Sequence, residues 1–383
     1  MTLITRTADL ERFVADLEGQ PYVTIDTEFM RDRTYYAQLC LVQLGAADQA
    51  VAVDTLADGI DLRALFELLA DERILKVFHA PRQDLEIFHQ LGDVLPRPLF
   101  DTQLAAMVLG HGDEIGYEAL VRNVAGAQLD KTARFTDWSR RPLTAKQIDY
   151  ALGDVTHLRT IYEQFADDLA KRGRSGWVDE ELQALLDPQL YVQRPEDAWR
   201  RLKVRSRDGR FLAILQEVAA WREREAQRRD LPRARILRDD VLMDAIAHRP
   251  RTVAALREVK RVSLDARGAE GFVAAVNDAL ALPDDALPRM PAPVRLPKGI
   301  GPLVDLLRVL LRLAAEEHDV AQRLIATTSD LELLAADDDA EIGALHGWRR
   351  DVFGEQALAL KRGDVALKAR GRRVELFHPE ATG

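Results

Sequence analysis

Alternation and helical spacing of hydrophobic positions divide the chain into a mixed first part and a helical remainder. Before residue 170, short apolar runs rich in β-branched residues are separated by charged or turn-prone residues, which is typical of strands. We predict strands at residues 22–29, 37–45, 50–55, 74–78 and 99–100. Apolar residues at helical spacing lie between these runs and predict interleaved helices, one of them starting at a proline and ending at a glycine. Strands interleaved with helices indicate an α/β domain.

A long helix is expected at the end of this α/β part. Residues 144–147 (TAKQ) have the spacing of a capping box, in which the Thr and Gln side chains reciprocally bond free backbone amides. Apolar residues continue at helical spacing to residue 171, and Gly173 is suited to end the helix. The sequence therefore predicts one helix from residue 144 to residue 171.

Strand signals largely vanish after residue 170, and amphipathic helices such as 211–228 and 242–248 replace them. Five prolines between Pro283 and Pro297 predict a semi-rigid linker, and two more prolines at 187–198 predict a hinge. The expected segments are an α/β domain (1–195), a first helical domain (196–284), a Pro-rich linker (285–297) and a second helical domain (298–383).

Charge is unevenly distributed along the chain. The formal net charge is −10, from 53 basic and 63 acidic residues, which argues against a protein that coats nucleic acid by bulk charge. Residues 200–235 nevertheless hold twelve Lys and Arg against five acids, a local net charge of +7. The pattern is compatible with a nucleic acid that is bound by one face of the protein. Within this segment, we interpret the Arg-rich helix 221–229 as a solvated face, with its arginines balanced by Glu223 and Glu225.

The number of cysteines and the hydropathy of the chain exclude several kinds of site and indicate the cell compartment. Cys40 is the only cysteine, which excludes an intramolecular disulfide and a structural zinc site built on several cysteines. It lies in an apolar run and is expected to be a small buried residue. Residues 1–6 lack the apolar core of a signal peptide, and no uncharged apolar stretch approaches the ~18 residues of a membrane span. We expect a cytoplasmic protein without a membrane partner.

Acidic residues on the first predicted strand are candidates for chemistry. Asp26 and Glu28 lie two residues apart, so both carboxylates project from the same face of the strand. The alternative is an amphipathic strand with a solvated polar face. Asp84 lies in the first turn of the helix opened by Pro81, where the helix dipole alone would favour an acid. Asp101 is placed to cap the next helix.

The long helix carries two further candidates. Tyr150 and Asp154 are four residues apart and therefore share a face, one turn from each other. The alternative is a partly exposed tyrosine that packs over an acid. Taken together, four carboxylates from one strand and two helices suit a hard divalent ion such as Mg²⁺ or Mn²⁺. Two such ions ~3.5–4 Å apart would neutralise the carboxylates and stabilise an in-line phosphoryl displacement.

Several motifs resemble those of a known enzyme family. Segments 25–29 (IDTEF), 79–85 (HAPRQDL) and 150–154 (YALGD) resemble the three exonuclease motifs of the DEDD superfamily, and the tyrosine in the third is typical of the DEDDy branch. The remaining similarity is to the ribonuclease D family. It is carried by 34–39 (TYYAQL), 100–103 (FDTQ), 129–131 (LDK) with Asp137-Trp138, and by the HRDC-like segments 231–237 (LPRARIL) and 345–349 (LHGWR).

This resemblance implies a ribonuclease H-like exonuclease domain, with a mixed sheet flanked by helices, followed by two all-α HRDC-type domains. The second helical domain departs most from the family pattern. Asp26, Glu28, Asp84 and Asp154 match the metal-binding positions, and Tyr150 matches the tyrosine that orients the attacking water. The implied cofactors are two divalent metal ions, Mg²⁺ or Mn²⁺.

The implied activity is a metal-dependent 3′-5′ exoribonuclease that releases nucleoside 5′-monophosphates. Its implied partners are RNAs with single-stranded 3′ ends, and above all tRNA precursors. One alternative is a 3′-5′ DNA exonuclease. The other is a non-catalytic nucleic-acid-binding scaffold, and such a scaffold would not need the four acids and the tyrosine.

Two neighbours of these motifs have open roles. Trp138 and Phe135 lie among basic residues that include Lys131 and Arg134, so they could stack a terminal base or simply pack. His79 is expected to be a hydrogen-bonded structural residue.

Overall fold

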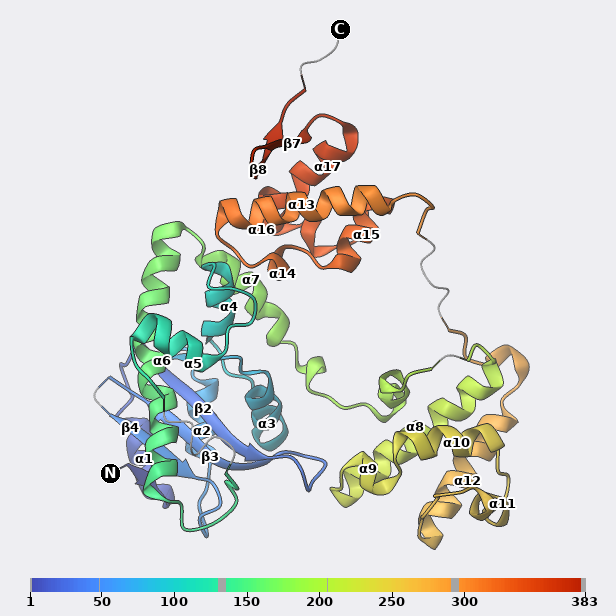
Figure 1. Ribbon diagram of the computed structural model, residues 1–383. Coiled ribbons are helices and arrows are strands. Elements are labelled where there is room, and N and C mark those ends of the chain that lie inside the picture. Colours follow the sequence, from blue (N-terminus) through green and yellow to red (C-terminus); the bar gives the residue numbers. More distant parts are fainter. Residues whose placement is uncertain (1, 48, 130–135, 205, 291–295, 380–383) are drawn as a thin grey trace.

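Hydrophobic clusters divide the chain into three lobes (Figure 1). The computed structural model describes residues 2–47, 49–129, 136–204, 206–290 and 296–379. We call the lobes the α/β domain, the first helical domain and the second helical domain. Their main clusters are built from residues 4–191, 198–279 and 304–357, respectively. The domain limits at residues 195, 284 and 297 stay a prediction.

A mixed sheet forms the centre of the α/β domain. In the described residues it has six strands in the order β1-β4-β3-β2-β5-β6. They are β1 (Leu3–Ile4), β2 (Tyr22–Met30), β3 (Gln38–Gly45), β4 (Ala50–Asp54), β5 (Leu75–Phe78) and β6 (Leu99–Asp101). β2 lies between β3, to which it is antiparallel, and β5, to which it is parallel. The predicted α/β class is confirmed, and β1 is a strand that the sequence pattern did not predict.

Helices flank this sheet. They are α1 (Thr7–Ala15), α2 (Arg63–Ala70), α3 (Arg82–Gly92), α4 (Thr102–Val108), α5 (Tyr117–Leu120), α6 (Ala145–Arg172) and α7 (Ser175–Leu185). The longest of these, α6, contacts β2, β3 and β4. It begins as expected, because the Thr144 side chain accepts from the Gln147 amide while the Gln147 side chain accepts from the Thr144 amide. Gly173 ends it in the left-handed conformation, at φ 65°.

The first helical domain follows two short 3₁₀ turns, η3 (Pro188–Leu190) and η4 (Pro195–Arg201). Its helices are α8 (Gly209–Arg229), α9 (Arg233–Ile236), α10 (Asp239–His248), α11 (Val253–Glu258) and α12 (Ala266–Ala281). Those of the second helical domain are α13 (Gly301–His318), α14 (Gln322–Ile325), α15 (Thr328–Ala336), α16 (Gly347–Arg349) and α17 (Glu355–Arg362). The latter domain also contains a hairpin, β7 (Ala366–Arg370) and β8 (Arg373–Phe377), which an all-helical prediction did not include.

The two helical domains begin with the same succession of helices. A long helix, α8 or α13, is followed by a one-turn helix and then by a helix of intermediate length. The long helices end at Asp230 and Asp319, and both aspartates adopt the left-handed conformation, at φ 47° and 48°. Each of these corners contacts the α/β domain.

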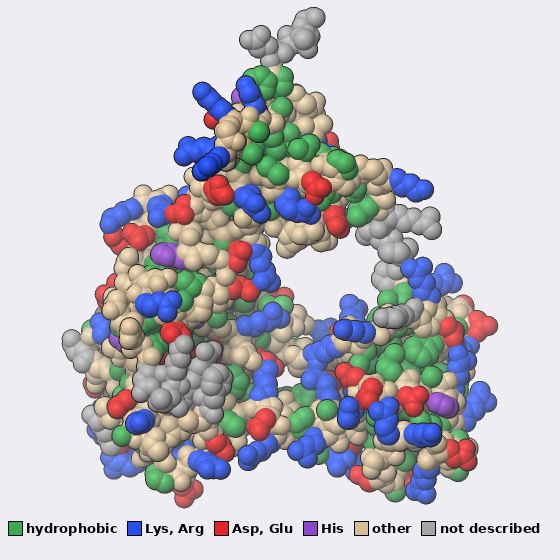
Figure 2. All heavy atoms as spheres, viewed as in Figure 1, with side chains coloured by type: hydrophobic (Ala, Val, Ile, Leu, Met, Phe, Trp, Pro, Cys, Tyr) green, Lys and Arg blue, Asp and Glu red, His purple; other side chains and the backbone are tan. Residues whose placement is uncertain are grey.

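The contacts of the two corners differ in kind. The Asp230 carboxylate accepts the backbone amides of Tyr35 and Tyr36, each at 3.0 Å. The Asp319 carboxylate pairs with Arg172 at 2.9 Å, and the neighbouring Ala321 amide donates to the Met107 carbonyl at 2.9 Å. Figure 2 shows an opening between the three lobes, with Lys and Arg side chains along the edge of the first helical domain that faces it.

One interpretation from the sequence was right for most arginines of a helix and wrong for two of its charged residues. The helix segment 221–229 was expected to present a solvated face, but Arg222 is 3% exposed and Glu223 is 1% exposed. Arg222 donates to the Leu237 carbonyl and to Asp239, while Glu223 pairs with Arg233. These charges are buried because each has a partner on a segment packed against α8.

Every helix in the part of the chain that the structure describes is too short or too polar to span a membrane.

Candidate active site

The polar face of β2 is covered by α6 rather than by solvent. Thr24 is fully buried, and its hydroxyl donates to the Val155 carbonyl at 2.8 Å. Gly45 on β3 permits this approach, because a Cβ there would lie 2.3 Å from Thr24 Oγ1 and 3.2 Å from Val155 Cβ. A solvated strand face is therefore not the explanation for Asp26, which lies two residues further along the same face.

Three of the four predicted acids come together at this interface. Asp26 and Glu28 from β2 and Asp154 from α6 each offer a carboxylate oxygen, and these oxygens lie within 4.8 Å of one another. Asp154 is buried, and the Tyr117 hydroxyl donates to its backbone carbonyl. A set of oxygen ligands from three carboxylates is the chemistry that Mg²⁺ and Mn²⁺ prefer.

Asp84 is held next to this cluster but is not one of its three members. It lies in the first turn of α3 and is 7% exposed. The Thr27 hydroxyl donates to Asp84 Oδ1 from the opposite face of β2. Burial, which outweighs the Thr27 hydrogen bond, raises the pKa of Asp84 to about 7. Asp101 caps α4 as predicted, accepting from the Gln103 amide at 2.8 Å.

The cluster is electrostatically unfavourable when it contains no cation. Burial raises the pKa of Asp26 well above its usual range, and the charges of Asp154, Asp84 and Glu28 raise it further. Carboxylates crowded in this way need positive charge nearby in order to ionise together. The donor set and its charge therefore fit divalent cations.

A pocket of about 290 Å³ opens onto the acids. Asp26, Asp154 and Tyr150 line it together with His79 and Tyr117, among other residues. Tyr150 is thus on the same cavity as the two acids, which agrees with its helical spacing from Asp154. Tyr117 was not found by sequence reasoning, because it lies outside the motifs and begins the short helix α5.

His79 has the structural role that was expected. Its Nδ1 lies 3.0 Å from Thr102 Oγ1, and its ring packs against Tyr117 with centroids 5.4 Å apart. Burial lowers the pKa of His79 to about 4, so the ring is neutral at physiological pH.

Trp138 packs and does not present a free face. It is 2% exposed, in a cluster with Cys40, and its ring centroid lies 6.2 Å from that of Tyr150. Cys40 is fully buried, and burial raises its pKa to about 11. The described residues do not include Phe135, Lys131 and Arg134. Most of the 129–131 motif also lies outside them.

Comparison with known proteins agrees with this geometry. A family model described as 3′-5′ exonuclease matches residues 1–170, and one described as HRDC domain matches residues 211–273. Ribonuclease D of Nitrobacter hamburgensis is 52% identical over 382 residues, covering 98% of this chain and 100% of the relative. Ribonuclease D of Granulibacter bethesdensis is 48% identical, covering 98% and 96%. The chain belongs to the ribonuclease D family.

Solved structures support the same assignment. The crystal structure of Escherichia coli RNase D, described as an exoribonuclease involved in structured RNA processing, matches with a TM-score of 0.79 at 29% identity. The match covers 94% of this chain and 98% of that chain. The catalytic core of RRP6 from Trypanosoma brucei shares the fold, with a TM-score of 0.56 at 20% identity.

Family membership establishes the fold and the general activity. The α/β domain is a ribonuclease H-like exonuclease domain, and an HRDC domain and a further helical region follow it. The chain is a hydrolytic 3′-5′ exoribonuclease, from a family of exonucleases that use divalent metals.

Proposed function

We propose that this member of the ribonuclease D family removes nucleotides from single-stranded 3′ ends of RNA with two divalent cations, and that it releases nucleoside 5′-monophosphates. The observation that carries the proposal is the meeting of Asp26, Glu28 and Asp154 within 4.8 Å, beside a pocket that Tyr150 lines. Crowded carboxylates without cations would be costly, so their presence here supports a metal-holding role.

Asp26, Glu28 and Asp154 would bind the cations directly, and Asp84 would complete the set. The charge of Asp84 raises the pKa of Asp26, so the two carboxylates lie close enough to interact. One oxygen of Asp84 accepts a hydrogen bond from Thr27, and this bond fixes the orientation of the Asp84 carboxylate. Bound Mg²⁺ or Mn²⁺ would lower the pKa of a coordinated water molecule and would stabilise the attacking and leaving oxygens of the phosphodiester. The described acids supply oxygen ligands alone, which favours these hard cations over Zn²⁺.

Tyr150 would hold the attacking water. It lies one turn before Asp154 on α6 and lines the same cavity as Asp26 and Asp154, which supports this role. A hydroxyl can both donate to and accept from a water molecule, so it can orient the oxygen toward the phosphorus. Tyr150 is therefore assigned a positioning role in the water attack.

The proposed substrates are RNAs with unpaired 3′ ends, and tRNA precursors are the class that we favour. RNA ends are recognised where bases are unstacked and can enter a pocket, as the pocket beside Asp26 would require. The basic side chains that border the opening between the lobes would contact phosphates of the rest of the RNA. The E. coli relative acts in structured RNA processing, which is compatible with this substrate class.

The test is hydrolysis of a 5′-labelled RNA and of a DNA of the same sequence, with Mg²⁺, Mn²⁺ or EDTA. With either metal we expect a ladder of shortened labelled RNA on a gel and nucleoside 5′-monophosphates in chromatography of the products, and we expect no turnover in EDTA. The Asp26→Asn variant should fold normally and lose nearly all turnover, because an amide replaces a shared metal ligand. Asp16→Asn, at an exposed position of the same domain, is the matched control.

Each part of the proposal can fail separately in this experiment. Wild-type-like turnover by the Asp26→Asn variant would overturn the metal site. Preference for the DNA strand would identify a DNA exonuclease instead. Binding of RNA without any turnover by the wild type would identify a scaffold.

A further inference from the structure

The loop between β2 and β3 joins the candidate active site to the first helical domain. This loop, residues 31–37, follows directly after the strand that carries Asp26 and Glu28. The pairing of β2 with β3 shifts register between Glu28 and Phe29, so the ladder is irregular at the residue that offers the carboxylate. The extra residue of this bulge is Cys40 on β3, which the pairing skips, so β3 bends opposite Glu28. Glu28 also lies only three residues before the loop, and we therefore expect the direction of its side chain to depend on how the loop is held.

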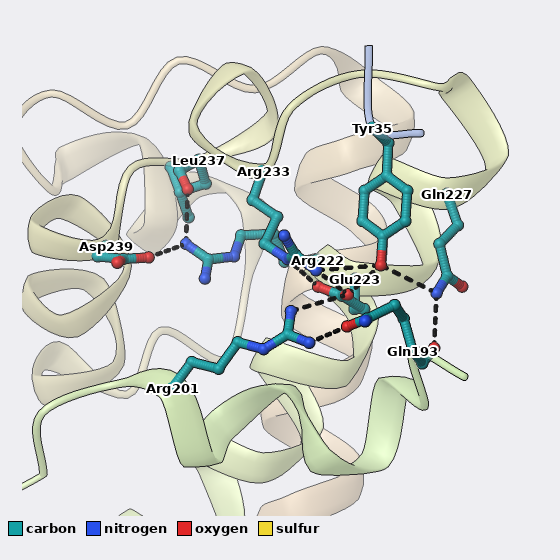
Figure 3. A network of polar contacts seen from close by, with 9 residues as sticks. All are labelled: Tyr35, Gln193, Arg201, Arg222, Glu223, Gln227, Arg233, Leu237 and Asp239. Carbon is teal, nitrogen blue, oxygen red and sulfur yellow. Dashed lines mark hydrogen bonds and ion pairs between the residues drawn. The ribbon is translucent and has the colours of Figure 1, made fainter. Parts of the chain in front are cut away.

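The first helical domain holds that loop through Tyr35 (Figure 3). The Tyr35 hydroxyl donates to the Glu223 carboxylate and accepts from Gln227 at 3.2 Å. The Arg233 guanidinium lies 4.7 Å from the Tyr35 ring centroid and donates to the Tyr35 hydroxyl at 3.1 Å. At the corner of α8, Asp230 accepts the amides of Tyr35 and Tyr36.

Glu223 is the centre of this network. It is 1% exposed and accepts two hydrogen bonds from Arg233, at 2.5 and 2.6 Å, while Arg201 lies 3.6 Å away. Burial acts to raise its pKa, but the bonds from Arg233 and Tyr35 outweigh burial and hold the pKa of Glu223 below its usual range. A buried, ionised carboxylate strongly favours the one loop position in which its donors are satisfied.

The other end of the loop is tied to the candidate site as well. Arg31 pairs with Glu86 at 2.7 Å, and Glu86 lies on α3 two residues after Asp84. The Thr34 hydroxyl donates to the Tyr36 carbonyl at 2.5 Å, which closes the loop on itself. The loop is thus a short, bonded connection between Glu223 in the helical domain and Glu28 in the α/β domain.

We propose that Glu223 and Tyr35 are positioning residues for catalysis, and that docking of the first helical domain sets the placement of Glu28. The helical domain then contributes to turnover itself, apart from any contact that it makes with RNA. This inference rests on the proposed function, because it takes Glu28 as a ligand of the cation. Small displacements of catalytic groups are enough to change rates strongly, so loosening the loop should lower kcat.

The experiment compares Glu223→Gln with Glu225→Gln in the full-length chain. Glu225 lies on the same helix and pairs with Arg228 within the helical domain, at 2.7 Å, so its variant is a matched control. With a ten-nucleotide RNA and Mg²⁺, we expect Glu223→Gln to lower kcat roughly tenfold and to leave KM within about twofold. Glu225→Gln should leave both constants unchanged.

Tyr35→Phe is the second variant, because it keeps the ring beside Arg233 and removes only the hydroxyl. It should lower kcat in the same way. The double variant should have the same kcat as Glu223→Gln alone, because both substitutions remove the same hydrogen bond between Tyr35 and Glu223. Hydrogen exchange should be faster at the amides of Tyr35 and Tyr36 in both single variants. Unfolding midpoints near that of the wild type would show that the domains remain folded.

The outcomes separate this inference from the proposed function. An active wild type with equal kcat for Glu223→Gln and Glu225→Gln would overturn the positioning role alone. A rise in KM at unchanged kcat would also overturn it, and would assign the network to RNA binding. A wild type without metal-dependent turnover would overturn the proposed function, and the inference with it.

Discussion

Lys76 is a buried basic residue of the exonuclease domain. It lies on β5 and is 0% exposed, and its ammonium group donates to the backbone carbonyls of Asp71, at 2.7 Å, and Arg97. Burial lowers the pKa of Lys76 to about 8, although the charges of Asp71 and Glu72 act in the opposite direction. The folded chain therefore releases this proton at a lower pH than the unfolded chain does.

This shift predicts a pH dependence of stability. Between the folded pKa of about 8 and the unfolded value near 10.5, the unfolded state binds more protons, so stability rises with pH. The Lys76→Met variant lacks the titrating group and serves as the reference. We expect the difference in unfolding free energy between the wild type and this variant to rise by about 1 kcal/mol per pH unit across this range. Urea unfolding at several pH values would measure it, and a flat difference would contradict it.

Tyr150 offers a second test at the scale of one residue. Tyr150→Phe keeps the ring next to Trp138 and removes only the hydroxyl of this pocket-lining residue. Since the lost hydrogen bond acts in the transition state, we expect kcat to fall roughly 100-fold with little change in RNA affinity or metal binding. Steady-state kinetics and RNA titration would measure this, and an unchanged kcat would leave Tyr150 as a packing residue.

Residue spacing could predict which side chains of the candidate site lie on the same face only where a regular strand or helix carries them. Two-residue spacing on β2 and four-residue spacing on α6 put Asp26, Glu28, Tyr150 and Asp154 on facing surfaces. Tyr117 escaped prediction because it lies outside the motifs and begins the short helix α5, whose place beside the pocket depends on the loop before it. The roles of all these residues, Asp84 included, stay predictions.

Among the elements, α6 links the stability of the fold to the site. Its first turn carries the capping box of Thr144 and Gln147, and Tyr150 follows within two turns. We expect Thr144→Ala to destabilise the exonuclease domain by about 1 kcal/mol, because amides at the helix start lose their partner. Urea unfolding would measure the loss. Thr156→Ala, in the middle of the same helix and away from the cap, is the control and should cost less.

Most strands and helices of the first domain could be predicted because their patterns are strong and their ends are marked. Observed bounds such as Gln38–Gly45 and Ala145–Arg172 differ from the expected ones by a residue. β1 was missed because two residues carry no periodicity, and its strand character depends on pairing with β4. The burial of Glu223 could not be predicted, since it depends on Tyr35, which is 188 residues away in sequence.

At the scale of the whole molecule, both helical domains dock on the exonuclease domain with the corner that ends their first long helix. The contacts of Asp230 and Asp319 repeat this arrangement with different partners. The second helical domain is therefore held by direct contacts with the exonuclease domain. Its position depends on the contact of α4 with Ala321, just before α14, and on the contact of α7 with Arg349 of α16.

Limited proteolysis tests this organisation. We expect the first cuts at 282–298, where prolines concentrate and described residues such as Pro283 and Lys298 are exposed. The segment 187–198 should resist longer, because Tyr191 and Ala198 within it are buried. Mass spectrometry of early fragments would locate the cuts. First cuts inside residues 1–170 would contradict the predicted limits.

The stack of Trp177 on Trp348 gives the molecule an optical signal of its own. The indoles come from the exonuclease domain and the second helical domain, and they lie nearly parallel, at 9°, with centroids 4.3 Å apart. Two identical chromophores this close share their excitation, and that coupling weakens steeply as the rings move apart. Near-ultraviolet circular dichroism should therefore contain a band from this pair, which Trp348→Phe removes. Release of the second helical domain could then be followed in real time without any attached dye.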